Sequence, residues 1–243
     1  IIRQRNLNNI NHWQKLQVFD TFFLDLWLGV HILQTMFLMI LWRKIMAKFP
    51  VPSEFVLLTT FSYVVGAIPF AAVVSKFKKV DLTKVGSGNY GATNVYRAMG
   101  LPYALLVFFL DAAKAGLMTY FATLLFESPI IHLVIAFSAI LGHTFSLFLG
   151  FKGGKGVACA AGVFAILTPI PFAITMAITL LIIFITRMVS VGSMVGAVLL
   201  PFLVYYFQFQ PIIFYFVSTI SFFIVFTHRA NIMRLIQGKE NKV

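Results

Sequence analysis

The sequence predicts an all-α integral membrane protein, a bundle of about seven transmembrane helices with three motif loops on the cytoplasmic side. Of its 243 residues, 60% are hydrophobic and only 11% are charged, and long apolar runs alternate with short polar loops. Soluble domains are typically about 45–50% apolar and about 25% charged. A helix of about 20 apolar residues crosses the hydrocarbon core of a bilayer. The lipid bilayer is therefore the first expected partner of this chain.

Seven apolar runs follow one another, separated by glycine, proline or charged residues. They lie near residues 53–75, 101–126, 130–149, 157–168, 172–186, 191–208 and 212–227. The first three and the last two are long enough to span a bilayer. The fourth and fifth are short and meet at Thr168-Pro169-Ile170-Pro171. They form either one long kinked helix or two helices joined by a proline turn.

The distribution of charge favours seven spans. If every run crosses the membrane, the cation-rich loops at 76–97, 152–155 and 187 share one side with the tail after 228. The cytoplasmic side of a membrane protein carries the excess of Lys and Arg. The net charge of +12 is then explained by loops beside anionic lipid or substrate, and no nucleic-acid partner is expected.

Residues 1–45 are predicted to be an N-terminal extension, separate from a transmembrane domain at 46–243. The run at 19–42 is apolar but contains acidic residues, so an interfacial helix, an extra membrane helix and a non-native upstream segment all remain open. Met46 is a candidate natural start, because every residue that carries chemistry lies beyond it.

Three polar islands interrupt the apolar runs and predict a site for an anion. The first island is Val85–Asn94 with Arg97, the second is Gly150–Gly156, and the third is His228–Arg234. Glycine lets backbone N–H groups approach a ligand closely, and Lys or Arg supplies counter-charge. Acidic residues are scarce near them, so a phosphate is the expected ligand. Apart from Asp111 with His132 and His143, the His, Asp and Glu residues are scattered, so no metal site and no cofactor are expected.

The islands resemble the three signature motifs of the PlsY-type acyl-phosphate:glycerol-3-phosphate acyltransferases. The matching segments are Val85–Asn94 with Arg97, Phe151–Gly156 preceded by His143, and His228–Glu240. Their order, spacing and apolar context match, as does Ile68-Pro69-Phe70, over about residues 53–243. The resemblance implies an enzyme of bacterial phospholipid synthesis, in the inner membrane with its active site facing the cytoplasm. It would transfer a fatty acyl group from acyl-phosphate to the 1-hydroxyl of glycerol 3-phosphate, giving lysophosphatidate and phosphate. The enzyme that produces acyl-phosphate is a candidate partner.

The chain departs from the family pattern at three positions. Ser146 stands where Pro is expected, Cys159 where Thr is expected, and Ala115 where Gly is expected after Asp111 and Lys114. The third departure weakens any role for Lys114.

The second island is predicted to bind a phosphate. Gly153, Gly154 and Gly156 allow close backbone approach, Lys155 adds charge, and the island opens a helix whose N-terminus favours anions. It is no Walker A motif, because Val157 follows Gly156. Taken alone, this island would be read as a basic turn.

In the first island, hydrogen-bonding side chains precede a cation. They are Ser87, Asn89, Thr93 and Asn94. Arg97 is expected to bind a phosphate through two parallel hydrogen bonds. The resemblance implies that Ser87 and Arg97 matter for activity and that Arg97 binds glycerol 3-phosphate. For Ser87 and Asn89 the competing explanation is a capped turn entering a helix.

In the third island, His228 and Asn231 lie three residues apart, on one helix face. The resemblance implies that they orient the acceptor or the acyl carbonyl. Glu240 is expected to be structural, as the partner of a nearby Arg or Lys, and His143 either faces the site or ends its span. The predicted catalytic set is Ser87, Arg97, His228 and Asn231. The predicted substrate-binding set is Asn89, Thr93, Asn94, His143, Gly153, Gly154, Lys155 and Gly156.

The general base is left open between His228 and the substrate's own phosphate, whose pKa is near ~6 by analogy with phosphorylated side chains. The phosphate of the substrate is the favoured base.

The sequence argues against two rival functions. No histidine is followed five residues later by aspartate, which excludes the His-x-x-x-x-Asp acyltransferases. A transporter of a phosphorylated solute is the alternative, although the chain has no internal repeat and its motifs lie at one face.

Overall fold

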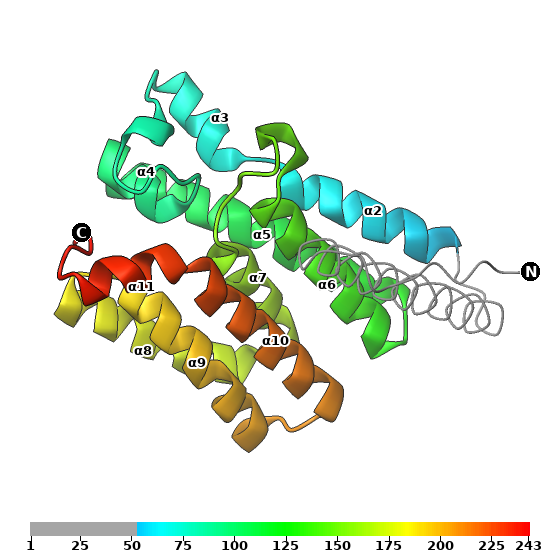
Figure 1. Ribbon diagram of the computed structural model, residues 1–243. Coiled ribbons are helices and arrows are strands. Elements are labelled where there is room, and N and C mark those ends of the chain that lie inside the picture. Colours follow the sequence, from blue (N-terminus) through cyan, green and yellow to red (C-terminus); the bar gives the residue numbers. More distant parts are fainter. Residues whose placement is uncertain (1–52) are drawn as a thin grey trace, which may run out of the picture. The chain divides into compact units, whose positions relative to one another are not determined.

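The computed structural model describes residues 53–243, and these residues form helices and loops without strands (Figure 1). In chain order the helices are α2 (Ser53–Ala67), α3 (Phe70–Phe77), α4 (Ala92–Met99), α5 (Leu101–Leu125), α6 (Pro129–Thr144), α7 (Val157–Leu167), α8 (Pro169–Thr186), α9 (Val189–Phe207), α10 (Pro211–Thr227) and α11 (Arg229–Ile236). Short 3-10 turns lie at Leu82–Lys84 and Leu147–Leu149. The predictions for residues 1–45, including the run at 19–42 and the start at Met46, lie outside the described residues.

Five stretches of the described chain are long and apolar enough to cross a membrane. They are Ser53–Phe77, Leu101–Leu125, Pro129–Leu149, Pro169–Thr186 and Val189–Phe207. A sixth is present if α10 and α11, which are bent by 54° at His228, are one span. Helix α7 has 11 residues, fewer than the about 20 that a span needs. The all-helical membrane class is confirmed, whereas the count of seven and the side on which each loop lies stay predictions.

The fourth and fifth apolar runs fold as two helices, α7 and α8, separated by Thr168. The Thr168 N–H group still donates to the Phe164 carbonyl, and Pro169 then begins α8. Proline also occupies the first or second position of α5, α6 and α10. Its fixed φ suits the start of a helix, and its missing N–H group has no intrahelical partner there anyway. The proline turn between these runs is therefore confirmed.

Glycines bring neighbouring helices into backbone contact. A Cβ on Gly66 would overlap the Ala139 carbonyl, and a Cβ on Gly142 would overlap the Tyr63 carbonyl, so α2 and α6 touch along their length. Helices α5 and α7 meet in the same way at Gly162. Such close packing of small residues replaces the hydrophobic driving force that is missing between helices in lipid.

The three islands lie in the connections between these helices. The first precedes and enters α4, the second lies between Leu147–Leu149 and α7, and the third begins at the bend between α10 and α11. Figure 1 shows α4 and α11 at the end of the described unit where the chain terminates.

Candidate active site

The structure brings the three islands into direct contact. The Asn89 side-chain amide of the first island donates to the Gly153 carbonyl of the second over 3.2 Å. The Lys155 ammonium of the second island donates to the Asn231 side-chain oxygen of the third. Beside this contact, the Thr227 hydroxyl donates to the Lys155 carbonyl over 3.1 Å. Segments that lie far apart in the sequence therefore form one polar region.

Each island contributes one cation to this region: Arg97, Lys155 and Arg234. Burial lowers the pKa of the Lys155 ammonium to about 8, and the positive charges of Arg234 and Arg97 act in the same direction. Glu240 is the carboxylate among them, paired with Arg234 at 2.9 Å. Three cations and one carboxylate leave an excess of two positive charges, which suits a phosphate. Arg234 had not been chosen from the sequence, although it belongs to the third island.

Glu240 organises the third island. Its carboxylate accepts from the Ser190 hydroxyl at 2.9 Å, from the Asn231 amide at 2.7 Å and from Arg234 Nε at 2.9 Å. Burial alone would raise the pKa of Glu240, but these hydrogen bonds and Arg234 hold it below its ordinary value. Because the Asn231 amide nitrogen faces Glu240, its oxygen faces Lys155. The predicted pairing of Glu240 with a nearby Arg is confirmed.

Arg97 has donors left for a ligand. Its Nη2 donates to the Asn241 carbonyl over 3.3 Å, and its Nε is buried without a hydrogen-bond partner among residues 53–243. Buried donors in native proteins nearly always have a partner, so a bound anion is the natural acceptor here.

The first island is shaped by Asn94, which is 1% exposed. Its side-chain oxygen accepts the Ser87 N–H group at 3.0 Å, and its amide nitrogen donates to the Leu82 carbonyl at 2.9 Å. The amide of Asn94 is thus engaged within the protein, and its oxygen also accepts from the Ser87 hydroxyl at 3.4 Å. Thr93 lies half-buried in the first turn of α4.

The glycines of the second island approach α6. The Gly153 N–H group donates to the Thr144 carbonyl at 3.0 Å, and the Gly154 N–H group donates to the His143 carbonyl at 3.1 Å. A Cβ on Gly153 would overlap the His143 carbonyl, and one on Gly154 would overlap the His143 ring. The close approach predicted for these glycines therefore occurs against the protein itself. Free backbone donors for a ligand lie further on, at the start of α7 after Gly156.

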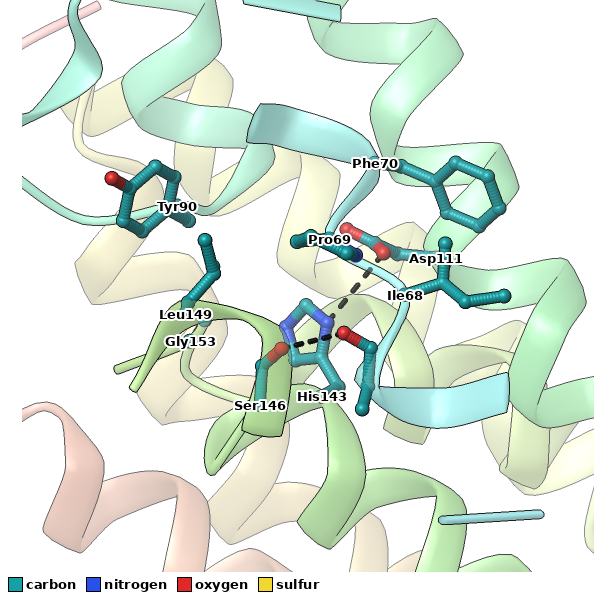
Figure 2. Close-up of a pocket in the computed structure, with 11 residues that line it drawn as sticks. Ile68, Pro69, Phe70, Tyr90, Asp111, His143, Ser146, Leu149 and Gly153 are labelled. Carbon is teal, nitrogen blue, oxygen red and sulfur yellow. Dashed lines mark hydrogen bonds and ion pairs between the residues drawn. The ribbon is translucent and has the colours of Figure 1, made fainter. Parts of the chain in front are cut away.

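A small pocket opens beside this loop, and His143 faces it (Figure 2). Asp111 lies behind the ring, with its carboxylate 3.5 Å from His143 Nδ1 and 2.7 Å from the Lys114 ammonium. Gly153 and Gly154 also line this pocket. The other nine predicted site residues do not line it: Ser87, Asn89, Thr93, Asn94, Arg97, Lys155, Gly156, His228 and Asn231.

Asp111 and Lys114 were not chosen as site residues. Their signal was present in the sequence: two charged residues three positions apart inside an apolar run. Ionisable residues within a span are costly and usually mark a function.

His228 is buried at the bend between α10 and α11, 3% exposed. Its Nδ1 lies 2.8 Å from the Ile224 carbonyl, so Nδ1 carries the hydrogen and Nε2 is left as an acceptor. Its neighbour Thr227 contacts Lys155, so His228 lies at the same polar region.

Comparison with known proteins identifies the family of this chain. The family model described as "Glycerol-3-phosphate acyltransferase" matches residues 56–238. A glycerol-3-phosphate acyltransferase of Endomicrobium trichonymphae is 40% identical over 189 residues, covering 77% of this chain and 95% of that protein. One from Aquifex aeolicus is also 40% identical over 189 residues, covering 76% and 97%.

Two solved structures are similar along the same part of the chain. A crystal structure of PlsY, an integral membrane glycerol 3-phosphate acyltransferase, in its glycerol 3-phosphate form has a TM-score of 0.76 and 35% identity, covering 79% of this chain and 96% of that one. The lysophosphatidic acid form has a TM-score of 0.73 and 34% identity, covering 78% and 95%. The chain therefore belongs to the glycerol-3-phosphate acyltransferase family of integral membrane enzymes.

Proposed function

We propose that this acyltransferase moves a fatty acyl group from acyl-phosphate to the 1-hydroxyl of glycerol 3-phosphate, giving lysophosphatidate and phosphate. The convergence of Arg97, Lys155 and Arg234, one cation from each island, carries the proposal. A phosphate monoester bears a charge of about −1.5 to −2 at pH 7, which balances the excess of two positive charges. The family name supports glycerol 3-phosphate as the acceptor.

Arg97 and Lys155 are assigned to the phosphate of glycerol 3-phosphate. Arg97 has a buried, unpartnered Nε among the described residues, and Lys155 is held by Asn231. A charged donor pair in a partly buried site stabilises an anion strongly. The donor phosphate is assigned to the start of α7, where Gly156 adopts φ +85° and the following N–H groups begin the helix. Ser87, in the loop that precedes α4, is assigned to the reacting groups.

The reaction needs no covalent acyl-enzyme. The 1-hydroxyl oxygen attacks the carbonyl carbon of acyl-phosphate and forms the ester C–O bond. The bond between that carbon and the phosphate oxygen breaks, and phosphate leaves with the electron pair. The hydroxyl proton passes to a base, and we assign this role to the phosphate of glycerol 3-phosphate. His228 Nε2 is available as an acceptor, but a proton there would create a second cation close to Lys155.

We also infer that the site faces the cytoplasm of a bacterial inner membrane. The cation-rich loops that form it support this orientation through the positive-inside rule. The enzyme that produces acyl-phosphate is then the natural partner on that side. Nothing in the fold or the comparisons favours a transporter of a phosphorylated solute.

The proposal is tested with purified protein in detergent or lipid. Acyl-phosphate and labelled glycerol 3-phosphate are supplied, and the lipid product is separated and identified, with acyl-CoA as donor in a parallel reaction. Labelled lysophosphatidate is expected when acyl-phosphate is the donor and not when acyl-CoA is the donor, because no island resembles a nucleotide site. Equal transfer from acyl-CoA would refute the donor assignment, and a labelled product acylated elsewhere would refute the chemistry.

A further inference from the structure

Helix α11 has two faces of different chemistry. With about 3.6 residues per turn, Asn231 and Arg234 lie on one face of the helix and Met233 and Ile236 on the other. The inner face belongs to the site, because the Asn231 amide and Arg234 Nε both donate to the buried Glu240 carboxylate. On the outer face, Met233 is 54% exposed and Ile236 is 74% exposed. One short helix thus carries both a part of the site and an apolar surface.

The outer face continues the exposed side of α10. Residues 222, 226, 229, 233 and 236 follow one another at spacings of three and four, the repeat of a single helix face. Phe222 and Phe226 are 74% and 55% exposed on a helix without charged residues. The chain bends by 54° between α10 and α11, so the end of this stripe leaves the direction of α10 (Figure 1). A short helix that leaves an apolar helix at such an angle, with apolar side chains on its outer face, suits the boundary between lipid headgroups and acyl chains.

Cations surround this apolar surface. The Arg229 guanidinium lies on it, 4.9 Å from the centre of an aromatic ring of α10, and Lys239 and Lys242 are exposed after the helix. Glu240 is the acidic side chain of residues 229–243, and it is buried in the site. The exposed charged side chains of this segment are therefore all positive. Basic residues beside an apolar stripe are attracted to the anionic headgroups of a bilayer.

We propose that α11 docks on the headgroup region of a bilayer that contains anionic lipid, and that this docking holds Asn231 in place for the reaction. The Asn231 oxygen accepts from Lys155, so movement of α11 also moves a contact between two islands of the site. A helix that is fixed before substrate binds loses less of the binding energy to ordering. Anionic lipid is then an activator of the enzyme, a role beyond the proposed function.

The first test locates the outer face of α11 and needs no activity. Ile236→Cys is labelled with a nitroxide in vesicles of phosphatidylcholine and phosphatidylglycerol, while the native Cys159 is fully buried and is not expected to react. The label is expected to be more accessible to oxygen, which dissolves in lipid, than to an aqueous nickel chelate. A label on Lys239→Cys is expected to show the reverse. Greater access of the nickel chelate to position 236 would place the outer face in water, and poor access of both reagents would place it under protein; either result overturns the proposal.

The second test measures kcat for acyl transfer at saturating substrates, so that repulsion of the anionic substrates by the lipid surface does not enter. In an equal mixture of phosphatidylcholine and phosphatidylglycerol, kcat is expected to be about threefold or more above its value in phosphatidylcholine alone. Arg229→Gln/Lys239→Gln should lose most of this activation, whereas Arg229→Lys/Lys239→Arg should keep it. The matched control is Lys76→Gln/Lys79→Asn, which removes two exposed cations outside the site and should also keep the activation. Asparagine tolerates the left-handed φ of +56° at position 79.

Folding is followed by gel filtration and thermal melting. If Arg229→Gln/Lys239→Gln does not fold, Ile236→Ser is measured instead and should show reduced activation. A wild-type kcat that is the same in both lipids overturns the proposal, as does equal activation of the wild type and the folded charge variant. Loss of activation in Lys76→Gln/Lys79→Asn would also overturn it, because net charge and not α11 would then be responsible. A wild-type enzyme that does not use acyl-phosphate overturns the proposed function, whereas the nitroxide measurement still decides where α11 lies.

Discussion

Glycine allows close backbone approach in two regions of this enzyme, with different consequences. Between α2 and α6, Gly66 and Gly142 let two helices touch. In the second island, Gly153 and Gly154 let a loop lie on the end of α6. The helical glycines keep their N–H groups inside their own helices, whereas the loop glycines donate theirs to α6 carbonyls.

The difference shows what a glycine-rich loop does in this site. Helix α6 sets the shape of the loop, because the N–H groups of Gly153 and Gly154 donate to α6 carbonyls. Binding capacity then lies with the cations and with the start of α7. Changes at helical glycines should therefore affect stability, changes at loop glycines should affect one substrate, and changes at the cations should affect turnover.

The largest effect is expected at the cations. Arg97→Ala should lower kcat/KM about 100- to 1000-fold, the cost of removing a donor aimed at developing charge. The melting temperature should change little, because Arg97 takes no part in the glycine contacts between helices. Steady-state kinetics and thermal melting measure the two quantities. Lys76→Ala, an exposed cation on α3, serves as the control and should keep full activity.

A helical glycine should behave in the opposite way. Gly142→Ala places a Cβ against the Tyr63 carbonyl, and overpacking of this kind costs about 1–3 kcal/mol. The melting temperature should fall while the folded fraction keeps its KM values. Val134→Leu on the same helix also adds atoms, but at a position 37% exposed, and should leave the melting temperature unchanged. A loss of activity in Gly142→Ala without loss of stability would remove the distinction between the two regions.

A loop glycine should give a smaller and more selective effect. Gly154→Ala pushes the His143 ring away, which should raise the KM for acyl-phosphate about tenfold, or about 1.4 kcal/mol. The KM for glycerol 3-phosphate should change by less than about twofold. Initial rates with each substrate varied in turn separate the two constants. If only the glycerol 3-phosphate constant rose, the donor and acceptor would have been assigned to the wrong places.

The smallest effect is a shift in pH dependence. Lys155 binds phosphate in its charged form, and burial lowers its pKa to about 8, so kcat/KM for glycerol 3-phosphate should fall as the pH rises through about 8. Lys155→Arg should retain activity at higher pH, because arginine stays protonated throughout the range measured. Rates measured between about pH 6 and pH 10 test this. If kcat/KM fell at the same alkaline pH in the wild type and in Lys155→Arg, a group other than Lys155 would be responsible for the fall.

The helices were predictable because their signals are local. The apolar runs placed the beginning of α10 within one residue and that of α8 within three residues, and Thr168-Pro169-Ile170-Pro171 marked the junction between α7 and α8. The placement of the three islands on one side came from the distribution of charge over seven spans, a count that stays a prediction. These inferences use only hydrophobicity, chain geometry and the positive-inside rule.

The contacts between α5, α6 and the second island could not be predicted in the same way. Asp111 and Lys114 were recognisable as a charged pair, but their partner His143 depends on how α5 and α6 rotate about their axes. The hydrogen bonds from the Gly153 and Gly154 N–H groups to α6 carbonyls could not be predicted either. Such contacts depend on tertiary packing, which the order of residues alone does not reveal.

The central claim is that distant islands act as one site, and a double-mutant cycle across the Lys155–Asn231 contact tests it most directly. kcat/KM is measured for Lys155→Met, Asn231→Ala and the double variant. The account predicts that the two effects are not additive, with a coupling of at least about 0.5 kcal/mol. Lys155→Met combined with Lys76→Ala supplies the additive reference. Additive losses for Lys155 and Asn231, within the error of that reference, would contradict a single site built from the second and third islands.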